Sequence, residues 1–253
     1  MSLGAHLVEL RKRLILSAVA IAAGAVVGWM LGDLIWAALE APVKRIAEAS
    51  SQNAQIVFPT ITGAFDLRLQ IAMYSGIIIS SPFWLYQVFA YFVPGLTRKE
   101  RRYLFGFFLS AVPLFVAGCA AGWIVLPHIV ELMTSFVPVG SASFLDASFY
   151  FQFVLKLVIA IGVAFVLPVF LVLVHFAGIL SAATIIRSWR MAIVVILTFT
   201  AIATPAADVV SMFLLAIPMI GLYFAAWLIA RTHDKRVAKR QAALLEANLE
   251  PSS

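Results

Sequence analysis

Charged residues are scarce in this chain of 253 residues, and their scarcity sets the class of protein. Only 12% of the residues are charged, whereas a soluble domain of this size carries roughly 25%. Hydrophobic residues make up 63% of the chain, more than a single soluble core can bury. The composition excludes a single soluble domain and predicts an all-α, polytopic protein whose helices cross a lipid bilayer.

Cysteine is almost absent, and the residues that usually carry catalysis are dispersed. Cys119 is the one cysteine, so a disulfide within the chain and any site built on cysteine pairs are excluded. The four histidines, His6, His128, His175 and His233, fall on different segments. No HExxH or GxSxG pattern and no glycine-rich phosphate loop is present. We therefore expect no enzyme, no catalytic residue, no metal site and no cofactor.

Six apolar segments predict six transmembrane helices. They cover 14–38, 69–93, 103–126, 149–177, 191–204 and 209–230. The first is too long for the apolar part of a signal peptide, and no convincing cleavage site follows it, so we expect it to be retained as a span. The fifth, with 14 residues, is about 21 Å long as a helix, against a bilayer core of ~30 Å. This shortness predicts either a locally thinned bilayer or a tilted span extended by its polar flanks.

Proline and glycine indicate how these spans are shaped. Prolines lie within four of the spans, at Pro82, Pro113, Pro168 and Pro218. They predict bent or broken helices that form a concave bundle. Gly24, Gly28 and Gly32 recur every four residues on the first span, which permits close helix approach. We favour packing within the chain, with a small partner helix as the alternative.

The charges that are present lie mostly at the ends of the spans, and they orient the chain. Of the 18 basic residues, 14 fall on one side, in the segments 11–13, 98–102, 187–190 and 231–240. The acidic residues show the reverse bias. Both termini are therefore expected to be cytoplasmic, and topology explains the net charge of +6 without a nucleic-acid partner. We expect one transmembrane domain, 1–230, and a cytoplasmic tail, 231–253, that forms a solvated or surface-lying helix.

Two cytoplasmic motifs carry the functional argument. The first, HLVELRKR at 6–13, directly precedes the first span, and the second, SPFWLYQVFAYFVPGLTRKERR, covers 81–102. With Ala41-Pro42, 165–169, Thr204-Pro205 and 215–219, these segments resemble the TatC family, the multispanning receptor of the twin-arginine protein export system. The resemblance covers essentially residues 5–230.

The resemblance implies a function, a location and partners. A protein of this family binds the twin-arginine signal peptides of folded precursors in a cytoplasmic (inner) membrane. It works with TatA- and TatB-type single-span proteins and with further copies of itself, and the proton gradient drives transport. A small-solute secondary transporter is the alternative, but it needs midplane polar groups and repeat symmetry, and no clear repeat is present. An intramembrane hydrolase would need a nucleophile and a base at membrane depth.

Two glutamates among basic residues are suited to recognising paired arginines. Glu9 and Glu100 lie on separate cytoplasmic elements, and a carboxylate can bind the planar fork of an arginine with two hydrogen bonds. The resemblance places the supporting residues at Leu10, Arg11, Gln87 and Tyr91. From the residues alone, the alternative is that both glutamates neutralise basic clusters or cap helices, and that Tyr91 is an interfacial anchor.

Three further residues are candidates for a role in translocation. Pro42 belongs to a segment that matches the family. Lys156 lies inside the fourth span, where a charge is functional by default unless the side chain reaches the interface. Asp208 matches an acidic position of the family, although we favour a role as the N-cap of the sixth helix. Val166 departs from the family, because many relatives carry an acid at that position.

Overall fold

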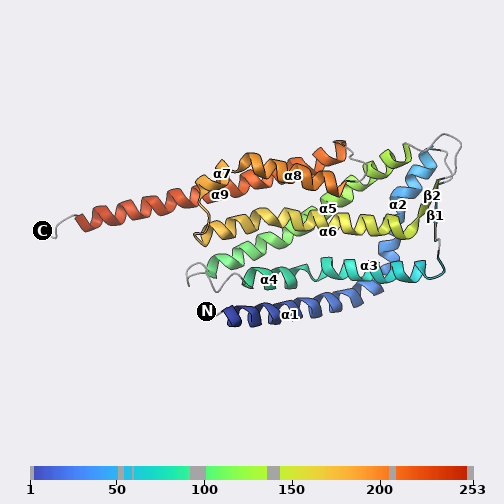
Figure 1. The fold of residues 1–253 in the computed structure, drawn as a ribbon, viewed down its shortest axis with the longest axis horizontal. Coiled ribbons are helices and arrows are strands. Elements are labelled where there is room, and N and C mark those ends of the chain that lie inside the picture. The colour runs from blue at the N-terminus through green and yellow to red at the C-terminus, as the bar shows by residue number, and fades with distance from the viewer. Residues whose placement is uncertain are drawn as a thin grey trace.

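The computed structural model describes the backbone of residues 3–50, 54–58, 60–91, 101–135, 143–204 and 209–249, which is mostly helical (Figure 1). The helices are α1 Leu3–Met30, α2 Gly32–Ser50, α3 Gly63–Ile79, α4 Ser81–Tyr91, α5 Arg101–Ser135, α6 Ala147–Phe176, α7 Ala182–Arg187, α8 Trp189–Ala203 and α9 Val209–Leu249. Strands β1 Ala54–Val57 and β2 Ser143–Asp146 pair in parallel, with Ala54 opposite Ser143. The predicted helical class is confirmed, and the small two-stranded sheet was not expected.

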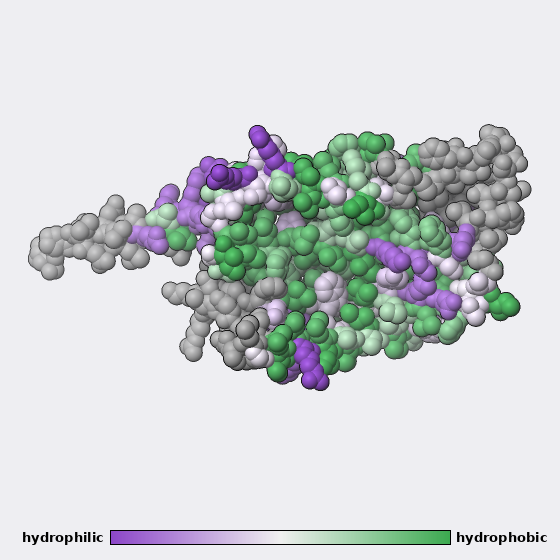
Figure 2. Space-filling model, in the orientation of Figure 1, coloured by the Kyte–Doolittle hydropathy of each residue, from purple (hydrophilic) through white to green (hydrophobic). Residues whose placement is uncertain are grey.

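Within the described residues, four helices are long and apolar enough to cross a membrane, which supports a multi-pass membrane protein. These stretches are Leu7–Met30, Gly106–Ile129, Ala147–Phe176 and Val209–Lys239. Three of them contain or closely match expected spans. The apolar helix α8 has 15 residues, or about 22 Å at ~1.5 Å per residue, so the short fifth segment is helical as expected. Hydrophobic residues cover most of the described middle of the face drawn in Figure 2.

The second expected span is not one continuous helix, which corrects the prediction of 69–93. It consists of α3 and α4, which meet at Ser80. Pro82 has no backbone N–H, so it cannot bond to the carbonyl of Ile78 and the regular ladder is interrupted. The indole N–H of Trp84 donates to the carbonyl of Ile77 (2.9 Å), and the N–H of Phe83 donates to the carbonyl of Ser80 (2.9 Å). These bonds satisfy polar groups at the break and start the second helix.

The first expected span, 14–38, is also divided. Helix α1 ends at Met30, and α2 leaves it in a different direction (Figure 1). Backbone bonds continue through the junction, because Leu31 donates to Val27 and Ile35 donates to Leu31, both at 3.0 Å. The junction at Leu31 is therefore a change of helix direction across which backbone bonds are kept, and Ser80 likewise donates to Gly76 and accepts from Trp84. By contrast, Pro113, Pro168 and Pro218 lie inside continuous helices.

Glycine allows α1 and α3 to pack backbone against backbone. A Cβ atom on Gly24 would lie 2.6 Å from the carbonyl oxygen of Gly76, and one on Gly28 would lie 2.7 Å from that of Ala72. Both distances are far below van der Waals contact. The glycine ladder thus packs within the chain at these two positions, whereas Gly32 has only Arg68 Nε, at 3.8 Å, near its Cβ position.

The main core lies between α3, α4, α5 and α6 and is rich in aromatic rings. Phe89, Phe115 and Phe151 are fully buried in it. One end, called the basic end below, contains the start of α1, the end of α4, the start of α5, the end of α6 with α7, and the polar extension of α9 (Figure 1). The opposite end contains α2, β1 and β2.

Candidate functional site

At the basic end, the carboxylate of Glu9 binds an arginine of the same helix. Arg13 donates to Glu9 Oε1 through Nε at 3.1 Å and through Nη2 at 2.7 Å. Its third nitrogen, Nη1, donates to Gln87 Oε1 on α4 at 3.2 Å. The Glu9 and Arg13 side chains are 22% and 23% exposed, so the pair is shielded but reachable from solvent.

Helix geometry explains why these three side chains meet. Glu9 and Arg13 are four residues apart and therefore lie on one face of α1. That face packs along α4, where Gln87 and Tyr91 are again four residues apart. Arg13 was not among the predicted site residues. Its spacing from Glu9 is the signal that could have distinguished it from its basic neighbours Arg11 and Lys12.

The other predicted recognition residues surround this pair or lie outside the described part. Leu10 is half-buried beside Glu9, and Arg11 is exposed on α1. Tyr91 is half-buried one turn beyond Gln87, at the end of α4. Glu100 lies outside the described residues, so its predicted convergence with Glu9 stays a prediction. The structure thus brings together Glu9 and Gln87, with Arg13 as the link between them.

The fold and the basic-end motifs agree with one family of proteins. A family model described as "Sec-independent protein translocase protein (TatC)" matches residues 5–218. This chain belongs to the TatC family. It is 42% identical to the Sec-independent protein translocase protein TatC of Xylanimonas cellulosilytica, over 96% of this chain and 88% of that protein. It is 34% identical to the TatC protein of Rothia mucilaginosa, over 100% of this chain and 86% of that protein.

A solved TatC structure has the same fold. The crystal structure of the twin-arginine translocase receptor TatC in the detergent DDM matches with a TM-score of 0.76 and 29% identity, over 89% of this chain and 99% of that one. The predicted TatC family membership is confirmed. The chain is a membrane-embedded component of the Sec-independent twin-arginine translocase, and the comparisons do not support the solute-transporter alternative.

The residues predicted to serve translocation do not lie with Glu9. Pro42 belongs to α2, at the opposite end of the molecule. Lys156 is exposed in the third turn of α6, whose first residue follows β2 at that same end. Asp208 lies outside the described residues. Val166, where the family resemblance led us to expect an acid, is buried in α6.

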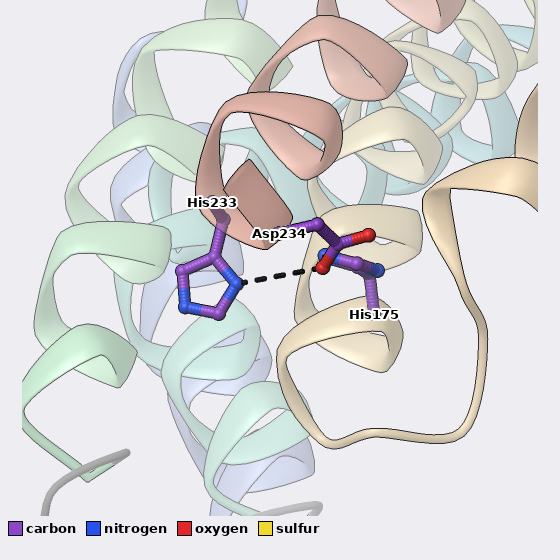
Figure 3. Close-up of side chains that lie close together, drawn as sticks. All are labelled: His175, His233 and Asp234. Atoms are coloured by element: carbon purple, nitrogen blue, oxygen red, sulfur yellow. Dashed lines mark ion pairs between the residues drawn. The ribbon is translucent and has the colours of Figure 1, made fainter. Parts of the chain in front are cut away.

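A second polar cluster, which the sequence did not predict, lies at the basic end. His175, the penultimate residue of α6, meets His233 and Asp234 of α9 (Figure 3). The histidines looked scattered because they are far apart in the chain. The available signal was their placement, since each lies near the end of an apolar span on the side that the basic residues mark as cytoplasmic.

Proposed function

We propose that this TatC-family chain binds the twin-arginine signal peptides of folded precursor proteins at its basic end. Glu9 and Glu100 receive the two arginines, and Leu10, Arg11, Gln87 and Tyr91 support the peptide. One observation carries the proposal: Glu9 already binds an arginine fork, and Gln87 holds the other side of that guanidinium. The site therefore has the chemistry that arginine recognition requires.

Glu9 keeps acceptor capacity for an incoming arginine. Both bonds from Arg13 end on Oε1, and an ionised carboxylate offers two oxygens with about four lone-pair sites. A peptide arginine can approach Oε2 while Arg13 stays in place, and Arg13 then fixes the orientation of the carboxylate. Burial of about three quarters of both side chains strengthens such a hydrogen bond relative to one in water.

The arrangement of the helices supports a topology with six spans and both termini in the cytoplasm. The spans are α1, α3 with α4, α5, α6, α8 and α9. The described basic residues 11–13, 187–190 and 231–239 lie on elements at the basic end (Figure 1), as the positive-inside rule requires of a cytoplasmic side. The spans form a single domain, 1–230, with kinked helices and a concave face, and the tail 231–253 extends into the cytoplasm from an energised inner membrane.

Transport itself requires partners, and this chain supplies the receptor and core. TatA- and TatB-type single-span proteins and further copies of this chain assemble around it, and the proton gradient drives export. The short helix α8 supports local thinning of the bilayer beside the site of passage. Pro42, Lys156 and Asp208 act in translocation, away from the recognition site, and no catalytic step is part of the proposal.

A binding assay with matched peptides tests this proposal. The protein, purified in detergent, is titrated with a fluorescent signal peptide that carries Arg-Arg or Lys-Lys. Glu9→Gln should weaken binding of the Arg-Arg peptide roughly 10- to 100-fold, because it removes a charge-assisted hydrogen bond of ~1.5–3 kcal/mol. The Lys-Lys peptide should bind about tenfold more weakly than Arg-Arg, because lysine lacks the planar fork.

The chain provides a matched control for Glu9→Gln. Glu40 forms the same kind of i,i+4 ion pair with Lys44, at 3.0 Å, on α2 at the opposite end. Glu40→Gln should leave peptide affinity unchanged. Equal affinities for both peptides, or equal losses in both variants, would contradict recognition by Glu9.

A further inference from the structure

Three potential metal-binding side chains meet where α6, α7 and α9 come together. His175 Nε2 lies 3.1 Å from Asp234 Oδ1, and His233 Nδ1 lies 4.0 Å from the same oxygen. One ligand atom from each residue lies within 4.8 Å of the other two. Figure 3 shows the side chains of the cluster, with His175 on α6 and His233 and Asp234 on α9.

The ring nitrogen of His175 that points away from the cluster makes a hydrogen bond, and this bond fixes the tautomer of the ring. Its Nδ1 lies 2.8 Å from the carbonyl oxygen of Leu180. A carbonyl only accepts, so Nδ1 carries the proton and donates it. In the neutral ring, Nε2 then carries no proton, and its lone pair faces Asp234 in the cluster. The His175 side chain is 97% buried. A backbone carbonyl on the second ring nitrogen is the usual support of a metal-binding histidine.

The side chains of Asp234 and His233 are also held in place, each by a contact with a residue outside the cluster. Asp234 accepts a hydrogen bond from the backbone N–H of Ala182 with Oδ2, at 3.4 Å, so Oδ1 is the oxygen that faces the histidines. The His233 ring packs against Phe176, with ring centroids 4.0 Å apart. All three potential ligands are therefore positioned before any ion arrives.

The facing atoms are arranged to accept a cation. A neutral His175 Nε2 and a carboxylate oxygen 3.1 Å apart present lone pairs to each other, and Nε2 makes no hydrogen bond of acceptable geometry there. A proton on Nε2 would relieve only the contact between His175 and Asp234. A single cation can accept electron pairs from all three atoms. We propose that His175, His233 and Asp234 bind a divalent transition-metal ion, with Zn²⁺ as the expected occupant.

The donor set and the spacing favour zinc. Two imidazoles and one carboxylate are typical zinc ligands, whereas Mg²⁺ and Ca²⁺ prefer oxygen alone. In a tetrahedral site with bonds of ~2.0–2.1 Å, ligand atoms are about 3.4 Å apart. The distances of 3.1 and 4.0 Å bracket that value. Asp234 is 47% exposed and His233 31%, so both have room for the small shifts that equalise these distances, and water can fill the fourth position.

The neighbouring charges also select the ion. Helix α9 carries Arg231 and Lys235 beside the cluster in sequence, and α7 ends at Arg187. The Arg231 guanidinium lies over the Trp227 ring at 5.3 Å. These positive charges oppose cations that bind only by attraction to a single carboxylate. An ion that bonds strongly to imidazole nitrogen is less affected.

Metal binding would tie α9 to the rest of the molecule at a specific place. The apolar part of α9 ends near Ala230, and the polar extension continues to Leu249. An ion shared between α6 and α9 would fix the direction of this extension relative to the cytoplasmic surface. The proposal concerns this tail and does not depend on the peptide site around Glu9.

Metal titration of the full chain tests the proposal. The protein is purified in detergent through a tag without histidine, stripped with chelator and titrated with Zn²⁺ against a chromophoric competitor. We expect one Zn²⁺ per chain, with affinity at least tenfold weaker in each of His175→Gln, His233→Gln and Asp234→Asn. His128→Gln is the matched control, because His128 is exposed on α5 away from the cluster, and it should bind like the unmodified chain.

Cobalt provides a readout that needs no variant to fold. Co²⁺ bound to the unmodified chain should give the intense visible absorption of a four-coordinate site, and added Zn²⁺ should abolish it. The absence of a stoichiometric site at micromolar Zn²⁺, a weak six-coordinate cobalt spectrum, or unchanged zinc affinity in His175→Gln would each overturn the proposal. The cluster would then be a protonated histidine–carboxylate contact only.

Discussion

At the scale of single residues, the Glu9 motif was readable from sequence, but the link from Arg13 to Gln87 was not. The motif at 6–13 contains three consecutive basic residues, and composition does not say which of them faces α4. Helical spacing selects Arg13 for Glu9, but only the packing of α1 on α4 brings Gln87 to its third nitrogen. The predicted partner Glu100 lies outside the described residues, so that half of the site rests on the family resemblance.

The bridge between Arg13 and Gln87 should be measurable as a coupling energy. In a double-mutant cycle of Arg13→Lys and Gln87→Leu, thermal unfolding in detergent should give a coupling of about 0.5–1.5 kcal/mol, because lysine keeps the charge but loses the fork. A second cycle pairs Arg13→Lys with Gln152→Leu on α6 and should be additive. Additivity in both cycles would mean that the bond across the helices contributes nothing to stability.

At the scale of helices, apolar length predicted the long elements and failed at their interruptions. Helices α5 and α9 each contain an expected span and α6 matches one to within a residue at its end, because long apolar runs leave few other structures possible in a bilayer. The effect of proline was harder to predict. Pro82 follows a helix break, whereas Pro113, Pro168 and Pro218 lie inside continuous helices. A proline in the sequence therefore does not by itself tell whether a helix breaks or continues, although at the Ser80 junction the Trp84 indole satisfies the carbonyl of Ile77.

Close packing of α1 on α3 predicts that a methyl group added to a glycine at this contact destabilises the protein, whereas one added to an uncrowded glycine does not. A Cβ on Gly76 would lie 2.6 Å from the backbone nitrogen of Ala25, so Gly76→Ala must push the helices apart. We expect a loss of about 1–3 kcal/mol of stability, measured by thermal or denaturant unfolding in detergent. Gly221→Ala on α9 is the control, since nothing lies within 4 Å of its Cβ position. It should be neutral or stabilising by up to ~1 kcal/mol. Similar effects of the two substitutions would contradict the packing.

At the scale of the whole molecule, the charge distribution predicted which segments gather together. Segments that are far apart in the sequence come together at one end of the fold (Figure 1). They are the start of α1, the end of α6 and the extension of α9. The sequence did not predict the β1–β2 pairing or the meeting of His175 with His233 and Asp234. Both depend on long-range contacts between segments whose local patterns carry no sign of each other.

The proposed orientation can be tested with single cysteines in a Cys119→Ala background. Lys239 is exposed on the extension of α9, and Lys44 is exposed on α2 at the opposite end. In intact cells, a membrane-impermeant maleimide should label Lys44→Cys, whereas Lys239→Cys should react only after the membrane is permeabilised. The reverse pattern would invert the proposed topology, and labelling of both residues in intact cells would exclude a cytoplasmic tail.

Photo-crosslinking in native membranes tests twin-arginine recognition most directly. A signal peptide with a photoreactive group next to its Arg-Arg or Lys-Lys pair is presented to the unmodified chain, Glu9→Gln or Glu100→Ala. We predict strong labelling of the unmodified chain by the Arg-Arg peptide, on α1 or α4 near Glu9 and Gln87. Labelling should fall sharply with Lys-Lys and with either variant. Equal labelling in every combination would show that the glutamates only balance charge, and it would contradict the receptor site proposed at the basic end.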